Sequence, residues 1–550
     1  MTSRQNNGNG DVFDYVIVGS GAAGAILANR LSADGKATVC LLEAGPSDWH
    51  PFLHIPAGFI KTLFNPTFTW QFNTEVGEHT NGRRIPVPQG RTLGGSTSVN
   101  GLVYNRGQAA DYDEWAALGN SGWSYAEVLP YFKRMECRIG EGDDRYRGRN
   151  GELPITDIDW KHPLCDAFIA GAVGMGIPRN PDYNGAKQDG VGYYQRTINH
   201  GWRMSAARTF LRPAKSRPNL SIYTNAHATQ VLLDGKRATG VAYVLNKNPV
   251  TARKVSASRE VILCCGAINT PKLLQLSGIG PAALLRQRGI NVQHELSGVG
   301  EHLTDHYSVR LVARVKNIKT MNELATGLGL IGQITRWLFR QPSILALSPS
   351  LIHFFWKSKE GVDRPDLQGV FSPASYREGY VGMLDNFPGI TAGVWQHRPK
   401  SLGYVRIRSA DPFANPEIQP NYLQHPDDRR VLVDGIRLAR KLLETPELAP
   451  YVECETLPGP AIQSDEQLLD FAHRYGVSSY HLNGTSHMGP ASDKMAVVDA
   501  NLRVHGLDGL RIADSSVIPK MPSANICAAT MMIAEKAADM ILGRPPLSGL

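Results

Sequence analysis

The stretch YVIVGSGAAGAILANRLS, residues 15–32, places a glycine-rich loop between a short apolar segment and a run of small residues. We expect a buried strand over residues 14–18 and a helix beginning over residues 25–31. In such a loop the first glycine permits a tight turn, the second admits a phosphate, and the third lets the helix pack closely. The helix N-terminus adds partial positive charge. The stretch predicts a Rossmann-type dinucleotide loop made of Gly19, Ser20, Gly21, Ala22, Ala23 and Gly24.

An acidic residue follows this loop at an informative distance. A second strand is expected over residues 37–42, and it ends at Glu43, nineteen residues after Gly24. A carboxylate at this point meets the ribose hydroxyls of a dinucleotide. The loop and the acid leave open whether the cofactor is a nicotinamide or a flavin dinucleotide, because both present a pyrophosphate and an adenosine ribose.

The composition is that of an ordinary globular enzyme. With 550 residues, 42% of them hydrophobic, the chain can bury a large core, and we expect two closely packed domains. The net charge of +8 is interleaved with 50 acids, so no nucleic-acid partner is expected. The seven cysteines lack metal-site spacing, which predicts no metal centre and favours a reduced, cytoplasmic compartment. Residues 1–10 are expected to form a flexible polar tail, and no transmembrane segment is expected.

A second glycine-rich segment, PQGRTLGGSTSVNGLVYNRG, spans residues 88–107. Bare backbone N–H groups and short hydroxyls over residues 91–100 can lie against a pyrophosphate and a flat ring that larger side chains would exclude. A further segment, VILCCGAINTPKLLQLSGIG over residues 261–280, predicts another strand-to-helix junction, with the helix starting at Thr270 and Pro271. Direct contact of this junction with the cofactor and a purely structural turn both remain open.

Together with residues 506–541, these segments resemble the glucose-methanol-choline (GMC) family of flavin-dependent oxidoreductases over nearly the whole chain. One family signature is matched by Gly90, Arg91, Leu93, Gly94, Gly95, Ser96, Thr97, Val99, Asn100 and Tyr104, and the other by Gly266, Ala267, Thr270, Pro271 and residues 277–280. The resemblance implies FAD as the cofactor. Some members attach FAD through a histidine in the first signature. Because Val99 stands at that position here, we expect FAD to be bound non-covalently.

The resemblance also implies which residues lie along FAD. Beyond the first loop and Glu43, the expected cofactor neighbours are Ala44, Arg91, Leu93, Gly94, Gly95, Ser96, Val99, Asn100, Gly101, Val103, Ala228, Gly266, Asp514, Ser515 and Asn525.

The catalytic pair implied by the resemblance lies near the end of the sequence. His481 in SSYHLNGTSHMG, residues 478–489, matches the family histidine, and Asn525 in MPSANICAAT matches its partner. A neutral imidazole is suited to take the hydroxyl proton of an alcohol while hydride passes to the flavin N5. An asparagine amide can donate a hydrogen bond to the developing alkoxide. For His487 we expect a structural or entrance role, and for His302 and His306 structural roles.

The order of the motifs implies an α/β (α+β overall) fold with a discontinuous Rossmann-type FAD-binding domain. This domain is expected over residues 11–155, 190–310 and 485–543. A substrate-binding domain, built on an antiparallel sheet covered by helices, is expected over residues 156–189 and 311–484. Residues 403–412 predict a strand and a turn, and the resemblance places the strand in the sheet that forms the back wall of the pocket.

An apolar stripe of helical period runs through Leu324, Leu328, Ile331, Ile334 and Leu338 and leads into ILALSPSLIHFFW, residues 344–356. Three interpretations compete for this region. They are core packing of the substrate domain, which we favour, a hydrophobic lid or substrate entrance, and a membrane-surface patch that docks to a quinone pool. A lid would favour an apolar or aromatic primary alcohol as substrate.

The expected function is FAD-dependent oxidation of a primary alcohol to the aldehyde, with His481 as the base and oxygen, a quinone or another compound as electron acceptor. A choline dehydrogenase-like enzyme is the nearest alternative, and its cationic substrate would need an aromatic cage or a carboxylate. A flavin-containing lyase or decarboxylase on the same scaffold is a second alternative. An NAD-dependent dehydrogenase would leave the 91–100 loop without a purpose, and a non-catalytic flavin module would leave the pair His481 and Asn525 unexplained.

Overall fold

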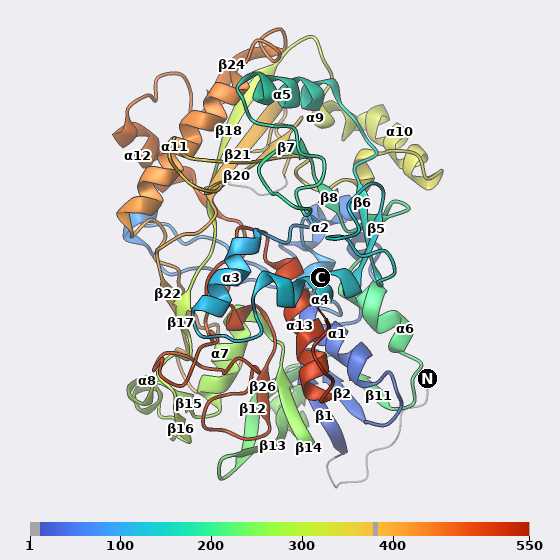
Figure 1. Cartoon of the computed structure of the whole chain (residues 1–550), viewed down its shortest axis with the longest axis vertical. Coiled ribbons are helices and arrows are strands. Elements are labelled where there is room, and N and C mark those ends of the chain that lie inside the picture. The colour runs from blue at the N-terminus through green and yellow to red at the C-terminus, as the bar shows by residue number, and fades with distance from the viewer. Residues whose placement is uncertain (1–10, 378–382, 549–550) are drawn as a thin grey trace.

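The computed structural model describes residues 11–377 and 383–548. The tail predicted over residues 1–10 lies outside these residues. Figure 1 shows two sheets at opposite ends of the molecule, with helices around them and between them.

The first sheet contains the predicted glycine-loop strand. Its order is β11 (Leu220–Tyr223), β2 (Val39–Leu42), β1 (Val12–Val18), β14 (Arg253–Leu263), β13 (Arg237–Leu245) and β12 (Ala226–Asp234), and β26 (Leu510–Ile512) also pairs with β14. Strands β11, β2, β1, β14 and β26 run parallel, whereas β13 and β12 are antiparallel additions. The parallel core confirms the predicted Rossmann-type arrangement.

Two helices cover the centre of this sheet. Helix α1 (Ala22–Leu31) starts directly after the glycine loop and packs against α13 (Cys527–Ile541). Helix α13 is buried on every side from Ala528 to Asp539, as expected for a helix enclosed between other elements. Both glycine loop and C-terminal segment are thereby brought to one edge of the sheet (Figure 1).

The second sheet is antiparallel, as the resemblance implied. Its order is β24 (Val452–Leu457), β18 (Tyr307–Val315), β21 (Gly389–Gln396), β20 (Leu367–Ser372), β19 (Ile352–Trp356) and β7 (Gly190–Tyr193), and β25 (Val477–Ser478) also pairs with β18. Helices α5 (Pro163–Gly174), α11 (Pro426–Leu443) and α12 (Asp465–Tyr475) lie on one face.

The two faces of the second sheet have different surroundings. Along β21, Ile390, Ala392 and Val394 are fully buried in the core. The alternate residues Thr391, Gly393 and Trp395 line a cavity on the other face. This period-two alternation is what a sheet between a helical layer and a cavity requires.

The strand predicted at residues 403–412 exists but belongs elsewhere. Strand β22 (Gly403–Arg406) pairs with β17 (Glu301–Leu303) and β23 (Glu417–Gln419) in a separate small sheet beside α7 (Gly266–Leu276). The expectation that it forms the back wall of the pocket was wrong. The wall is built instead by β18, β20 and β21.

Helix α7 begins four residues before its predicted start. Gly266 opens it with φ +78°, and Pro271 lies inside the helix rather than at its first turn. Proline has no N–H to donate to the carbonyl of Ala267. That carbonyl accepts from the Thr485 hydroxyl at 2.7 Å instead, so the proline is accommodated.

Core packing was the wrong interpretation for the apolar stripe over residues 324–338. It is right for the strand in the segment that follows, residues 344–356. Residues 324–338 form the end of α9 (Met321–Leu324) and all of α10 (Gly327–Leu338), which projects from the upper right of Figure 1. Leu328 is 87% exposed and Leu338 65%. By contrast, β19 is almost entirely buried. A helical period reveals a stripe but not whether anything covers it.

The remaining α-helices of four residues or more are α2 (Phe59–Thr62), α3 (Ala109–Ala117), α4 (Tyr125–Met135) and α8 (Ala282–Gln287). The remaining strands are β3 (Thr69–Trp70), β4 (Gln89–Gly90), β5 (Glu136–Ile139), β6 (Leu153–Asp157), β8 (Gln195–Arg196), β9 (Ile198–Asn199), β10 (Trp202–Arg203), β15 (Ile279–Gly280) and β16 (His294–Glu295). Within the described residues, no helix combines the length and apolarity needed to span a bilayer.

Candidate active site

One cavity runs from the glycine loop to the open face of the second sheet. The sequence-predicted residues that line it are Gly19, Gly21, Ala22, Ala23, Glu43, Ala44, Gly95, Ser96, Val99, Asn100, Gly101, Val103, Ala228, Gly266, Asp514, Ser515, His481 and Asn525. Five predicted residues do not line it: Ser20, Gly24, Arg91, Leu93 and Gly94. Several of these five residues lie behind the residues that form the wall of the cavity.

The two glycine-rich segments touch each other at the cavity. The Gly94 N–H donates to the carbonyl of Ser20 at 3.0 Å. A Cβ added at Gly95 would come within 2.6 Å of the Gly21 Cα. Only bare backbone fits at this crossing, and Gly95 also has φ +52°. The crossing leaves a narrow cradle of backbone at the helix α1 N-terminus, where an anion is favoured.

Glu43 locks the first loop to the end of β2. One carboxylate oxygen accepts from the Ser20 N–H at 3.0 Å and from its hydroxyl at 2.6 Å. The other oxygen accepts from the Gly45 N–H at 2.8 Å. Burial raises the pKa of Glu43, and these hydrogen bonds oppose the rise. The oxygen that accepts from Gly45 keeps a further lone pair that can accept from a ribose hydroxyl at the cavity surface.

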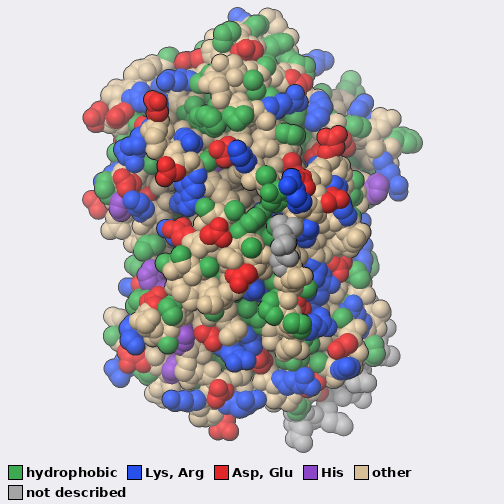
Figure 2. Space-filling view, viewed as in Figure 1, with side chains coloured by type: hydrophobic (Ala, Val, Ile, Leu, Met, Phe, Trp, Pro, Cys, Tyr) green, Lys and Arg blue, Asp and Glu red, His purple; other side chains and the backbone are tan. Residues whose placement is uncertain are grey.

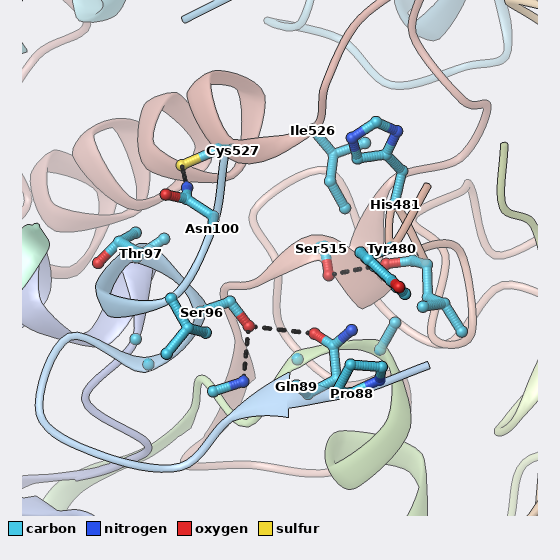
Figure 3. Close-up of a pocket in the computed structure, with 18 of the residues that line it drawn as sticks. Pro88, Gln89, Ser96, Thr97, Asn100, Tyr480, His481, Ser515, Ile526 and Cys527 are labelled. Carbon is cyan, nitrogen blue, oxygen red and sulfur yellow. Dashed lines mark hydrogen bonds between the residues drawn. The ribbon is translucent and has the colours of Figure 1, made fainter. Parts of the chain in front are cut away.

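Arg203 holds the second glycine-rich segment in place through hydrogen bonds to Asn100. Its guanidinium donates to the carbonyl of Asn100 at 2.8 Å and to the Asn100 side-chain oxygen at 2.9 Å. Burial lowers the pKa of Arg203 to about 9. On the cavity side, the Ser96 hydroxyl lies between the Gly90 N–H and the Gln89 side chain, as the dashed lines of Figure 3 show. The loop is thus held on both sides while its backbone faces the cavity.

Asp514 joins the start of helix α7 to its own segment, residues 514–516, at the cavity. Its carboxylate accepts from the Gly266 N–H at 2.9 Å and from the Thr270 hydroxyl at 2.6 Å. It also accepts from the Ser516 N–H at 2.8 Å. The predicted second junction therefore meets the cavity, and at Gly266 an added Cβ would meet open space.

His481 stands at the other end of the cavity, across from Ser96, Thr97 and Asn100 (Figure 3). Its ring makes two hydrogen bonds. Nδ1 lies 2.9 Å from Nδ1 of His306, and Nε2 lies 3.0 Å from the amide nitrogen of Asn525. Burial lowers the pKa of His481 well below its usual range, so the ring is neutral at neutral pH.

The proton positions on both rings follow from a single carbonyl. Nε2 of His306 lies 2.8 Å from the carbonyl oxygen of His397, which can only accept, so this nitrogen carries the hydrogen. Burial lowers the pKa of His306 to about 4, so its other nitrogen, Nδ1, is an acceptor. Nδ1 of His481 must then donate to it. The lone pair of His481 is left on Nε2, at the cavity.

Asn525 is oriented in the same way by its neighbour. Its side-chain oxygen accepts from the Gln368 amide at 3.1 Å, and that amide also donates to the Tyr194 hydroxyl at 2.9 Å. The Asn525 nitrogen therefore points to His481. Its second hydrogen is available for an oxygen in the cavity.

A buried carboxylate anchors the backbone of His481. Asp305 accepts from the His481 backbone N–H at 2.7 Å, and its second oxygen accepts from the hydroxyls of Tyr422 and Ser478. Burial raises the pKa of Asp305 to about 6. The start of β18 thus fixes both the backbone and, through His306, the ring of His481.

The other predicted histidines lie away from the cavity. His487 pairs with Asp493 at 3.0 Å, and the His302 ring packs edge-on against it at 4.5 Å. These contacts agree with structural roles. For His306 the structural role was an incomplete expectation, because its ring is hydrogen-bonded directly to His481.

Sequence reasoning missed the residues that the second sheet contributes. Arg310 of β18 and Trp395 of β21 line the cavity, as do Tyr376, which lies between β20 and β21, and Tyr480, which directly precedes His481. Arg310 follows His306 by four residues, and its polar side chain interrupts an apolar strand. That interruption was the available signal for a cavity-facing position.

The cavity fits FAD by its donor set and by its shape. The backbone cradle suits a pyrophosphate, Glu43 suits a ribose, and the glycine-rich loop 94–101 suits a flat ring. Among the described residues no group of three or more potential metal ligands occurs. A dinucleotide cradle that opens onto a buried neutral histidine is typical of an oxidoreductase, and the second glycine-rich loop, which suits a flat ring, favours a flavin.

Comparisons with known proteins identify the family. Sequence models of the GMC oxidoreductase family match residues 13–308 and 399–534. The chain is 39% identical over 542 residues to alcohol dehydrogenase [acceptor] of Pseudomonas putida, covering 98% of this chain and 97% of the relative. It is 41% identical over 539 residues to the oxygen-dependent choline dehydrogenase of Brucella anthropi, covering 97% and 96%. The crystal structure of pyridoxine 4-oxidase from Mesorbium loti superimposes with a TM-score of 0.87 at 29% identity, covering 98% and 100%.

The chain belongs to the GMC oxidoreductase family, FAD-dependent enzymes that act on CH–OH groups.

Proposed function

We propose that this enzyme oxidises a primary alcohol to the aldehyde, with His481 as the base. The observation that carries the proposal is the hydrogen-bond chain from the His397 carbonyl through His306, which leaves the lone pair of His481 on Nε2 at the cavity. When bound, FAD supplies the acceptor for the hydride that leaves the alcohol carbon. The final electron acceptor would be oxygen, a quinone or another compound.

The protein residues have separate tasks in this proposal. Nε2 of His481 takes the hydroxyl proton, and the free N–H of Asn525 donates to the oxygen as negative charge develops on it. Both tasks require the substrate hydroxyl to lie within hydrogen-bonding reach of Nε2 and of the Asn525 nitrogen together, and these two atoms are 3.0 Å apart without substrate. Gln368 keeps the amide from flipping.

The cofactor is held in this proposal by backbone and by small side chains. The crossing of Gly21 and Gly95 would receive the pyrophosphate, Glu43 the ribose, and the loop 96–101 the ring system. Val99 offers only a hydrocarbon side chain at the attachment position, consistent with non-covalent binding. We keep the two-domain division as a proposal. Its first domain centres on the sheet of β1 and its second on the sheet of β18, which also includes β7 from residue 190.

The test is an anaerobic visible spectrum of the purified holoenzyme before and after addition of benzyl alcohol, octanol, choline or glucose. Bleaching of the flavin by benzyl alcohol or octanol is the expected result. Flavin that stays oxidised with every alcohol while a cyanohydrin or a fatty acid is consumed would replace the proposal by the lyase or decarboxylase alternative.

Choline oxidation is the second candidate, because one relative is a choline dehydrogenase. The cavity does contain aromatic side chains, among them Tyr376, Trp395 and Tyr480. Its lining carboxylates within the described chain are Glu43 and Asp514, which lie at the dinucleotide end and accept from protein donors. A cation would therefore meet no acid beside His481, and we rank choline below an uncharged alcohol.

Replacing His306 by phenylalanine is expected to slow flavin reduction by about 10- to 100-fold, because the acceptor that holds the hydrogen on Nδ1 of His481 is lost. Glutamine at this position can donate to the His397 carbonyl and accept from His481, so it should restore most of the rate. Stopped-flow reduction at varied substrate concentration checks this. A purely structural role would give equal losses in both variants, or a loss of flavin without a change in rate.

We propose further that α10 places the enzyme at a membrane surface from the cytoplasmic side, where a quinone can accept the electrons. Leu328, Ile331 and Leu338 face solvent together with Phe339, and Arg336 and Arg340 flank them. Figure 2 shows apolar side chains with basic neighbours at the upper right edge, the position of α10 in Figure 1. An exposed apolar face with flanking cations is typical of a helix that lies in the interface of an anionic bilayer.

The double variant Leu328→Glu/Leu338→Glu is expected to bind anionic phospholipid vesicles at least about 10-fold more weakly than the unaltered enzyme. Co-sedimentation measures this binding. Val250→Glu is the control, since Val250 is 92% exposed on the hairpin between β13 and β14. Absence of vesicle binding in the unaltered enzyme would contradict the membrane proposal and leave the lid interpretation.

A further inference from the structure

Arg310 is a cation on the substrate side of the cavity. It lies on β18, opposite Gly393 of β21, and both residues line the cavity. A Cβ at Gly393 would lie 3.8 Å from the Arg310 Cγ, so the two positions are in contact on the same face of the sheet. The next residue, Leu311, is fully buried in the core and does not line the cavity, whereas Ser308, two residues before Arg310, does line it. The strand alternation thus places this side chain on the cavity face.

No carboxylate of residues 11–377 and 383–548 pairs with Arg310. The closest cation–aromatic contact of its guanidinium is with the Tyr376 ring, 6.0 Å from the ring centroid. Its positive charge also acts to lower the pKa of Tyr480, which burial raises to about 12. The nearby acid Asp305 is taken up by His481, Tyr422 and Ser478. A partly buried guanidinium that has no carboxylate partner among the described residues can bind an anion that enters the cavity.

The position of Arg310 also sets the distance between the substrate hydroxyl at His481 and the substrate group that the arginine can bind. Two residues before it, Ser308 pairs with Trp395, whose ring centroid lies 6.3 Å from that of His481. Two residues of strand span roughly 7 Å. A molecule with its hydroxyl at His481 therefore reaches Arg310 with a group several bonds away.

We propose that the substrate of this site is an alcohol that carries a carboxylate several bonds from its hydroxyl, and that Arg310 binds the carboxylate. The inference rests on the proposed function and narrows its substrate class. In the reaction the hydroxyl proton goes to Nε2 of His481, the hydride goes to FAD, and the aldehyde forms while the carboxylate stays unchanged. The aromatic residues Tyr376 and Tyr480 favour an aromatic or aliphatic spacer over a sugar.

The test uses a set of benzyl alcohols of one shape and different charge with the holoenzyme. They are 4-(hydroxymethyl)benzoate, its methyl ester, and 4-(hydroxymethyl)benzylammonium, with benzyl alcohol as reference. The unaltered enzyme is expected to prefer the carboxylate to the ester by about 10- to 100-fold in kcat/KM, with the ammonium compound poorest. In Arg310→Met this preference should collapse to near unity, and in Arg310→Lys part of it should remain.

A matched control is available on the same strand. Arg314 lies over the Phe387 ring at 4.4 Å and does not line the cavity, so Arg314→Met should keep the carboxylate preference. A second measurement does not depend on turnover. The unreactive 4-methylbenzoate should perturb the flavin spectrum on binding, and Arg310→Met should weaken that binding about 10- to 100-fold.

The outcomes separate the two proposals. If benzyl alcohol reduces the flavin but the carboxylate has no advantage, or if Arg310→Met keeps the advantage, only the role of Arg310 is overturned. If no alcohol of the set reduces the flavin and 4-methylbenzoate does not bind, the proposed function and the inference fall together.

Discussion

Flavin reduction by an alcohol is expected to be at least about 100-fold slower in His481→Ala, with FAD still bound. Without the imidazole no described side chain replaces Nε2 next to the Asn525 amide. The measurement is the rate of anaerobic bleaching in a stopped-flow instrument, together with the flavin content of the purified variant. His200→Ala is the control, because His200 is an exposed histidine outside the cavity.

The pH dependence of the same rate tests the protonation state of His481. Burial holds its pKa well below the usual 6.5, so the lone pair on Nε2 is available throughout the neutral range. The rate should therefore stay flat as the pH is lowered through 6.5 and should fall only at lower pH, where the ring binds a proton. A step centred near 6.5, or unchanged reduction in His481→Ala, would exclude this histidine as the base.

Gly95→Val is expected to yield protein with less than about a tenth of the normal flavin content. A Cβ at Gly95 would lie 2.6 Å from the Gly21 Cα, and valine strongly disfavours φ +52°. Relief of this overlap requires the two glycine-rich segments to move apart, which opens the cradle. The ratio of flavin absorbance to protein absorbance measures the loss.

The variant Gly235→Val is the control that separates the effect of the steric overlap at Gly95 from the effect of its unfavourable φ angle. Gly235 has φ +56°, close to that of Gly95, but it lies in the turn between β12 and β13 with nothing within 4 Å of an added Cβ. This variant should bind FAD normally at a small loss of stability. Normal flavin content in Gly95→Val would show that the crossing does not hold the cofactor.

The local parts of the fold were predictable from the sequence because their signals are short-range. The strand, loop and helix around Gly19 and the acid at Glu43 follow from spacing within about 30 residues, and β1, α1 and β2 form as expected. The family signatures singled out His481 and Asn525, which the structure brings to 3.0 Å. The assignment of these residues to catalysis stays a prediction for the experiments above.

The rest depends on contacts between distant segments. His306 meets His481 across 175 residues, and Gln368 meets Asn525 across 157. Pairing of β18 with β21 decides that Arg310 faces the cavity, and no local pattern reveals such a partner. The exposure of α10 was missed for the same reason, because a stripe of apolar residues is the same whether a core or solvent lies beside it.

The 3.0 Å contact between His481 and Asn525 also depends on the spacing between the two sheets. His481 is anchored to Asp305 and His306, which directly precede β18 of the second sheet, whereas Asn525 lies two residues before α13, which is packed against α1 of the first sheet. A hinge motion of even one ångström between the sheets would pull the pair beyond hydrogen-bonding distance. The distance between His481 and Asn525 thus depends on the spacing of the two sheets, and if the pair is catalytic as proposed, a crosslink or a mutation that moves the sheets apart should abolish activity without altering either residue.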